Sequence, residues 1–186
     1  MGLIAAEIKQ RRPFRSAGHE AVLSLLRTAD VVRRAGARVI ERHGITPQQF
    51  NVLRILRGAG AEGLPTLEIA ERMIEEAPGI TRLLDRLERK TLVKRHRCPR
   101  DRRRVLCTIT PPGLRLLAAL DAPLAEAEEA LMRSLGPARA VRLVALLDVV
   151  RSRAADSPAD ADRSRSRPRP GRAGRHRPRT KEKKKR

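Results

Sequence analysis

The spacing of apolar residues changes from a helical to a strand-like period between Thr66 and Thr110. Apolar residues first recur at three-and-four spacing in two short segments, which is typical of amphipathic helices. From Val105 to Ile109 the sequence instead alternates between two faces, as a half-buried strand does. The stretch therefore predicts two short helices joined by a tight turn and followed by a hairpin, which is a helix-turn-helix with a wing.

Each of these elements has a predicted boundary. We expect Thr66 to cap the first helix, whose buried side consists of Leu67, Ile69, Ala70, Met73 and Ile74. We expect Pro78 to open the second helix, which extends to about Lys90. This helix buries Ile80, Leu83, Leu84 and Leu87 and leaves outside Thr81, Arg82, Asp85, Arg86 and Arg89. The strands are predicted over about 92–97 and 104–110, with a basic turn over 98–103.

A longer helix is predicted on the N-terminal side, over about 20–43. Its apolar stripe consists of Val22, Leu25, Leu26, Ala29, Val32, Val39 and Ile40. Gly44 is expected to end it. Thr46, Pro47 and Gln49 then form the pattern of a capping box, which opens a helix to about Arg57.

Two more helices are predicted on the C-terminal side. Thr110, followed by two prolines, starts a helix rich in Leu and Ala, which Pro123 is expected to kink. Gly136 and Pro137 open the last helix. Its apolar stripe consists of Val141, Val144, Leu147 and Val150.

Composition limits the class of protein. The 186 residues suffice for about one domain with an appendage, and Phe14 and Phe50 are the only aromatic residues, so aliphatic side chains have to build the core. The net charge of +21 is typical of proteins that meet a polyanion. No apolar run approaches the roughly 20 residues of a membrane-spanning helix, and no signal peptide is expected in the first ten residues. We expect a cytoplasmic protein that binds nucleic acid and no membrane.

The end of the chain has a different composition. After about Asp156 it consists mainly of Ser, Pro, Gly, Arg and Lys, and residues 157–186 contain thirteen basic and three acidic residues. Such a segment cannot bury a core and is expected to be a disordered basic tail. Weak nonspecific contact with DNA is its favoured role, with a partner-binding arm or a solubilising extension as alternatives.

Positive charge is concentrated between Arg82 and Arg104, where eleven basic and three acidic residues occur. Contact with DNA phosphates explains this concentration, and the alternative is a solvated charged face. Arg82 could bind a guanine edge through two hydrogen bonds or could bind a phosphate, and the sequence leaves both readings open.

The sequence gives less support to catalytic, metal-binding and redox roles. Asp101 lies among arginines without a second carboxylate, histidine or nucleophile at a catalytic spacing, so a structural ion pair is the preferred interpretation. The four histidines form no ligand pair at i and i+4. Cys98 and Cys107 flank the turn and could form a redox switch, although the alternation of Cys107 with its neighbours favours a buried core position. No enzyme activity, cofactor or metal is predicted.

From about Glu20 to Arg153 the chain resembles the bacterial MarR-type (multiple antibiotic resistance) regulators. The most specific stretch reads ITRLLDRLERKTLVKR from Ile80 to Arg95, and it is followed by Pro99, Asp101, Arg102, Arg103, Ile109, Thr110 and Gly113. Similar motifs precede it in TPQQF at residues 46–50, with Val52 and Leu53, and in EIAERM at residues 68–73. The chain has Thr91 where the family usually has Gly, directly after the second helix of the pair.

The resemblance implies a mainly α-helical winged helix-turn-helix with a two-stranded wing, whose N- and C-terminal helices pair two subunits. It implies that Thr81 and Arg82 face bases or phosphates in the major groove and that Arg86 contacts the backbone, with Pro78 and Gly79 in the same DNA-binding set. Asp101 would pair with Arg103 to shape the wing. The wing arginines that reach the minor groove would be Arg100, Arg102, Arg103 and Arg104.

These observations predict one MarR-like domain over residues 1–156 and the tail over 157–186. The DNA-reading part is expected at about 46–110, and the dimerisation helices at about 18–43 and 111–154. The predicted function is sequence-specific regulation of transcription by a homodimer bound to double-stranded DNA. The resemblance adds repression that a small-molecule effector relieves. The alternative is an architectural or nucleoid-type DNA-binding protein with little sequence preference.

Overall fold

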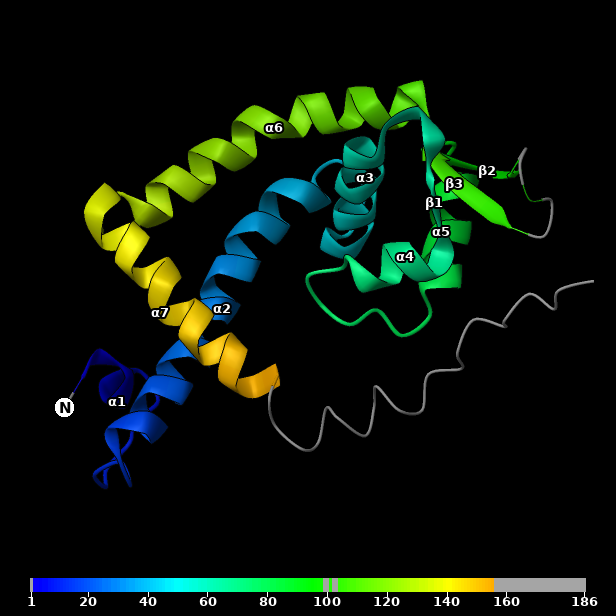
Figure 1. The fold of residues 1–186 in the computed structure, drawn as a ribbon. Helices are drawn as coiled ribbons and strands as arrows, with labels where there is room; N and C mark the ends of the chain where they lie inside the picture. Colours follow the sequence, from blue (N-terminus) through cyan, green and yellow to red (C-terminus); the bar gives the residue numbers. More distant parts are fainter. Residues whose placement is uncertain (1, 99–100, 102–103, 156–186) are drawn as a thin grey trace, which may run out of the picture. The chain divides into compact units, whose positions relative to one another are not determined.

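A computed structural model describes residues 2–98, 101 and 104–155 of the chain, so the predicted tail lies outside the described residues. The chain divides into two compact units, Met1–Ser134 and Leu135–Arg186. The elements of the first unit are α1 (Leu3–Glu7), α2 (Ala17–Glu41), α3 (Pro47–Ala59), the 3-10 helix η1 (Gly60–Glu62), β1 (Leu64–Pro65), α4 (Thr66–Glu71), α5 (Ile80–Arg89), β2 (Val93–Arg97), β3 (Val105–Ile109) and α6 (Pro111–Met132), and the second contains α7 (Pro137–Ala155) (Figure 1). The predicted class, mainly helical with a small antiparallel sheet, is confirmed.

Polar side chains fix the starts of α2 and α3. Ser16 Oγ accepts a hydrogen bond from the backbone N–H of His19 at 3.1 Å. The predicted capping box of α3 is confirmed: Thr46 Oγ1 accepts from the Gln49 N–H at 3.2 Å, and the Thr46 N–H donates to Gln49 Oε1 at 3.0 Å. Between the two helices Gly44 turns the chain with a φ of 72°, which confirms the predicted stop.

The two wing strands belong to a three-stranded antiparallel sheet in the order β1-β3-β2. β2 and β3 form the predicted hairpin, with Val93 opposite Ile109. The sequence does not predict β1, which has only two residues and places Leu64 opposite Cys107. A Cβ on Gly63 would lie 2.5 Å from the Cys107 carbonyl oxygen, so the glycine permits this close pairing.

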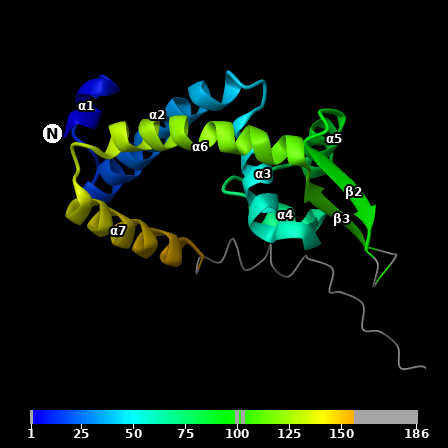
Figure 2. The same cartoon turned by 90° about the horizontal axis from the view of Figure 1, so that it is seen from above.

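One aliphatic core lies where the helices meet the inner face of the sheet. Its fully buried side chains come from α3, α4, α5, the wing strands and α6: Val52, Leu53, Leu56, Ile69, Leu84, Leu87, Val93, Cys107, Leu117 and Leu120. α6 contacts both α2 and α3 (Figure 2) and continues through Pro123. Arg57 on α3 donates to both carboxylate oxygens of Asp121 on α6, at 3.1 and 2.8 Å.

The first helix of the predicted pair differs from expectation. Thr66 does not cap α4: Pro65 holds the N-cap position, and no side-chain hydrogen bond caps the helix. Ile69 is fully buried as predicted, but Leu67 is 78% exposed and Ile74 is 81% exposed. The prediction is wrong at these two positions because α4 ends well before Ile74 and because Leu67 lies roughly 200° around the helix from Ile69.

Apolar side chains remain exposed on α2 and α7. On α2 only Ile40 is buried, whereas Val22 is 53% and Leu26 is 64% exposed. In the second unit, α7 begins at Pro137 as predicted and exposes Val141, Val144, Leu146, Val149 and Val150. In the part of the chain that the structure describes, no helix is both long enough and apolar enough to cross a bilayer.

Candidate nucleic-acid interface

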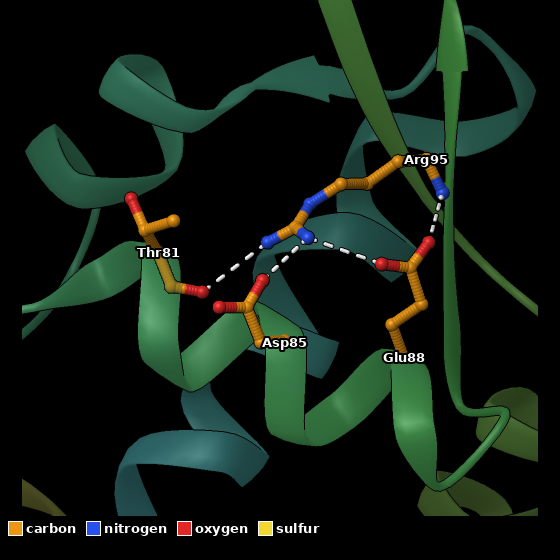
Figure 3. Close-up of polar contacts among 4 residues, drawn as sticks. All are labelled: Thr81, Asp85, Glu88 and Arg95. Atoms are coloured by element: carbon orange, nitrogen blue, oxygen red, sulfur yellow. Dashed lines mark hydrogen bonds and ion pairs between the residues drawn. The ribbon is translucent and has the colours of Figure 1, made fainter.

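The second helix of the pair, α5, has three distinct faces. Leu83, Leu84 and Leu87 are buried in the core. The outward face carries the exposed basic side chains Arg82, Arg86 and Arg89. The third face carries Asp85 and Glu88, which together with the backbone carbonyl oxygen of Thr81 are directed toward Arg95 on β2 (Figure 3). The helix therefore presents a basic surface and holds its two carboxylates against the wing.

The start of α5 lies two residues later than predicted. Gly79 is the N-cap, with a φ of 89°, and its carbonyl oxygen accepts from the Leu83 N–H at 3.2 Å. Pro78 lies outside the helix, so the prediction that it opens α5 is wrong. A left-handed backbone favours glycine, which explains why Gly79 rather than Pro78 precedes the first turn. Both residues are exposed beside Thr81 and Arg82.

The end of α5 sets the direction of the chain into β2. Thr91 has a φ of 58°, its N–H donates to the Glu88 carbonyl at 2.8 Å, and the Leu92 N–H donates to the Leu87 carbonyl at 3.0 Å. These two bonds form a Schellman motif, with the buried Leu87 and Leu92 at the positions that usually share an apolar contact. Thr91 thus adopts the conformation for which glycine is the usual residue.

Arg95 on β2 joins the wing to α5 (Figure 3). Its Nη1 donates to Asp85 Oδ1 at 2.6 Å and to Glu88 Oε2 at 3.0 Å, and its Nη2 donates to the Thr81 carbonyl oxygen at 3.2 Å. Burial alone would lower the pKa of Arg95, but the hydrogen bond with Asp85 and the charges of Asp85 and Glu88 raise it overall. The guanidinium therefore stays charged and offsets the two carboxylates.

Sequence reasoning assigned no role to Arg95. A usable signal was present, because the carboxylates of Asp85 and Glu88 lie three residues apart on a side of α5 that is neither apolar nor basic. The interaction of Lys90 with the α2–α3 turn was also missed: Lys90 Nζ donates to the carbonyl oxygen of Gly44. This contact joins residues 46 positions apart, and no local pattern predicts it.

The described part of the wing contains Asp101 and Arg104 of the predicted set. Both are exposed, the Arg104 N–H donates to the Asp101 carbonyl at 2.9 Å, and the Cys98 N–H donates to the Arg104 carbonyl at 2.9 Å. Arg100, Arg102 and Arg103 lie outside the described residues. The expected pair between Asp101 and Arg103 therefore stays a prediction.

A cavity of about 430 Å³ lies in the first unit, between α2, α3, α5 and α6. Its lining is mainly apolar and includes Val32, Phe50 and Leu124, together with Arg54 and Arg86. Arg86 thus belongs both to the outward face of α5 and to the wall of this cavity. Among the described residues, no three His, Cys, Asp or Glu side chains form a group that could hold a metal ion.

Comparison with known proteins agrees with this geometry. The model of the MarR family matches residues 45–105, which run from the turn before α3 into the wing. A MarR transcription factor from Planctomyces limnophilus is 37% identical, and its structure aligns with a TM-score of 0.56 over 74% of this chain and 99% of that one. MepR from S. aureus, solved in a complex with DNA, is 27% identical, with a TM-score of 0.63 over 69% of this chain and 95% of that one.

A third structure contains a bound ligand. CouR from Rhodococcus jostii RHA1, bound to p-coumaroyl-CoA, is 26% identical, with a TM-score of 0.63 over 77% of this chain and 98% of that one. The alignments thus span nearly the full length of each of these three proteins. The chain belongs to the MarR family of transcriptional regulators.

Proposed function

We propose that this chain is a homodimeric, sequence-specific DNA-binding regulator that inserts α5 into the major groove. The observation that carries the proposal is the exposed row of Arg82, Arg86 and Arg89 on a helix whose carboxylates are held by Arg95. A helix of this diameter fits the major groove, where each base pair presents a distinct pattern of donors and acceptors. The MepR complex with DNA supports this use of the fold.

The residues have different roles in this proposal. Arg82, with Thr81, reads base edges, and Arg86 binds the DNA backbone, with Pro78 and Gly79 close to the DNA at the start of α5. In the wing, Asp101 pairs with Arg103 to hold its shape. The arginines that reach the minor groove are Arg100, Arg102, Arg103 and Arg104.

A dimer accounts for the exposed apolar faces. The core of a single chain leaves apolar side chains exposed, including Val22 and Leu26 on α2 and the apolar residues of α7. Exposed apolar surface of this kind is typical of an interface with another chain. Residues of about 18–43 and 111–154 would form the dimer interface, and about 46–110 would read the DNA, within one domain over 1–156. A two-fold dimer would bind a roughly palindromic operator with one α5 in each half-site. The segment 157–186 would add nonspecific attraction to phosphate.

We further infer repression that a small molecule relieves. A dimer bound across a promoter excludes other proteins from the same DNA. The cavity of about 430 Å³ has the size and the mainly apolar lining typical of ligand sites. Because Arg86 lines the cavity and also faces outward on α5, a ligand there would act on the DNA-reading helix directly. The bound p-coumaroyl-CoA of CouR supports a ligand-responsive regulator.

A binding selection on random duplexes tests the proposal. The purified dimer should enrich a reproducible motif with two related half-sites about one helical turn apart. An architectural DNA-binding protein would bind through charge alone and would enrich no motif. Recovery of duplexes without a common sequence would therefore replace the regulator with that alternative.

A further inference from the structure

The hydrogen bonds of Arg95 hold α5 at one angle to β2, and the positive charge of Arg95 offsets the two carboxylates of α5. We propose that Arg95 is a positioning residue for DNA binding: it locks α5 against the wing strand β2 and neutralises the two carboxylates of α5. The proposal rests on the proposed function, in which α5 and the wing contact the same duplex.

The geometry separates the acidic and basic groups of α5. At roughly 100° per residue, Arg82, Arg86 and Arg89 fall within a narrow arc, whereas Asp85 and Glu88 lie about a quarter turn away. Arg95 reaches that second arc from β2 and contacts it at three levels, the Thr81 carbonyl, Asp85 and Glu88. Three contacts along about two turns of helix oppose both rotation and sliding of α5 relative to the strand.

Glu88 strengthens the lock because both of its carboxylate oxygens contact Arg95. Oε2 accepts from the guanidinium at 3.0 Å, and Oε1 accepts from the Arg95 backbone N–H at 3.1 Å. That N–H belongs to β2, an outer strand of the sheet, and points away from β3, so the sheet itself offers it no partner. The Glu88 carboxylate is therefore bound to the backbone of β2 as well as to the Arg95 side chain, and this fixes its position along the strand.

The charge of Arg95 matters for DNA. Its side chain is only 23% exposed, so its charge is less screened than that of a surface arginine. Without it, Asp85 and Glu88 would carry two negative charges beside a surface that meets phosphates, well within a Debye length of about 8 Å. Without Arg95, the carboxylates of Asp85 and Glu88 should repel the DNA phosphates and weaken binding to every duplex. The loss of the fixed angle between α5 and β2 should additionally reduce the preference for the operator.

Arg57 provides a matched control. It also joins two elements through a carboxylate, since it donates to both oxygens of Asp121, and it lies between α3 and α6 rather than between α5 and the wing. Arg57→Gln removes one positive charge and one inter-element ion pair of the same kind. It should change stability without changing the ratio of affinities for two duplexes.

The test measures dissociation constants for the duplex recovered in the selection and for its scrambled version, at a temperature where all variants are folded. Arg95→Gln should weaken binding to both duplexes and should reduce the preference for the operator about tenfold, the size of one lost base contact. Arg95→Lys keeps the charge without the planar fork, so it should bind the scrambled duplex normally and prefer the operator less. Adding Asp85→Asn and Glu88→Gln to Arg95→Gln should restore scrambled-duplex affinity but not the preference.

Hydrogen exchange of the protein without DNA gives a second readout: Arg95→Gln should speed exchange in α5 and β2, and Arg57→Gln should not.

A wild-type protein that binds both duplexes equally would contradict the proposed function. A wild-type protein that prefers the operator, combined with an unchanged preference in Arg95→Gln and Arg95→Lys, would defeat the role of Arg95. An equal loss of preference in Arg57→Gln would also defeat it, by showing a general effect of stability. If Arg95→Gln does not fold, Arg95→Lys decides the question.

Discussion

Cys107 on β3 lies directly opposite Arg95 on β2, in the centre of the hairpin. Cys98 comes three residues after Arg95, so its side chain points to the other face of the sheet, and its Cα lies roughly 10 Å further along the strand. A disulfide needs Cα atoms within about 7 Å of each other. The register therefore excludes a Cys98–Cys107 disulfide while the strands stay paired, and the buried position of Cys107 is the prediction that is confirmed.

The two thiols should differ in reactivity. Burial raises the pKa of Cys107, and the nearby Arg95 only partly offsets this, so the thiol should stay protonated at pH 8. Cys98 is half-buried and should react first. Mass spectrometry after treatment with iodoacetamide should find the label on Cys98 in the folded protein and on both residues only in denaturant. Equal labelling of both residues under native conditions would contradict the structure.

Two helical glycines should respond oppositely to substitution by alanine. A Cβ on Gly113 in α6 would lie 2.5 Å from the Leu92 carbonyl oxygen and 2.7 Å from Ile109 Cγ1, whereas one on Gly58 in α3 meets no described atom within 4 Å. Gly113→Ala should lower the free energy of unfolding by about 2 kcal/mol because backbone has to move. Gly58→Ala should raise it by roughly 0.5–1 kcal/mol through helix propensity. Urea unfolding measures both, and a change of the same sign in the two variants would contradict the packing of α6 on the hairpin.

Thr91 should be a site of stabilisation. A β-branched residue in the left-handed conformation costs about 1–2 kcal/mol, and glycine avoids this cost. Thr91→Gly should therefore raise the free energy of unfolding by roughly 1 kcal/mol and leave operator affinity unchanged. Thr91→Ala is the control, since it removes the side-chain oxygen but retains the Cβ. If alanine stabilised the protein as much as glycine, the φ of Thr91 would not be the cause.

The dimer should depend on the exposed apolar face of α2. Leu26→Glu places a charge on that face and should shift the protein from dimer to monomer in sedimentation at micromolar concentration. Leu67→Glu is the matched control, because Leu67 is equally apolar and more exposed but lies on α4. A dimer that persists in Leu26→Glu would contradict a role of this face of α2 in the interface. Dissociation by Leu67→Glu as well would show that the effect of Leu26→Glu is not specific to α2.

The order of the elements could be read from sequence because period changes and caps are local. The Thr46–Gln49 capping box and the alternation from Val105 to Ile109 both predict structure that forms as expected. The short strand β1 could not be predicted, because it exists only through pairing with β3. The roles of Arg95 and Lys90 were missed for the same reason: each contacts a residue that folding, and not sequence, brings close.

Base reading by α5 can be tested with a matched set of titrations of Arg82→Ala and Arg104→Ala, with the selected operator and a scrambled duplex at several salt concentrations. Arg82 lies on the exposed face of α5, and Arg104 at the exposed wing. Arg82→Ala should weaken operator binding by roughly 1–3 kcal/mol with little loss on the scrambled duplex. Arg104→Ala should weaken both alike and reduce the salt dependence by about one unit. Equal losses on both duplexes for Arg82→Ala would contradict base reading by α5 and would favour a protein that binds DNA by charge alone.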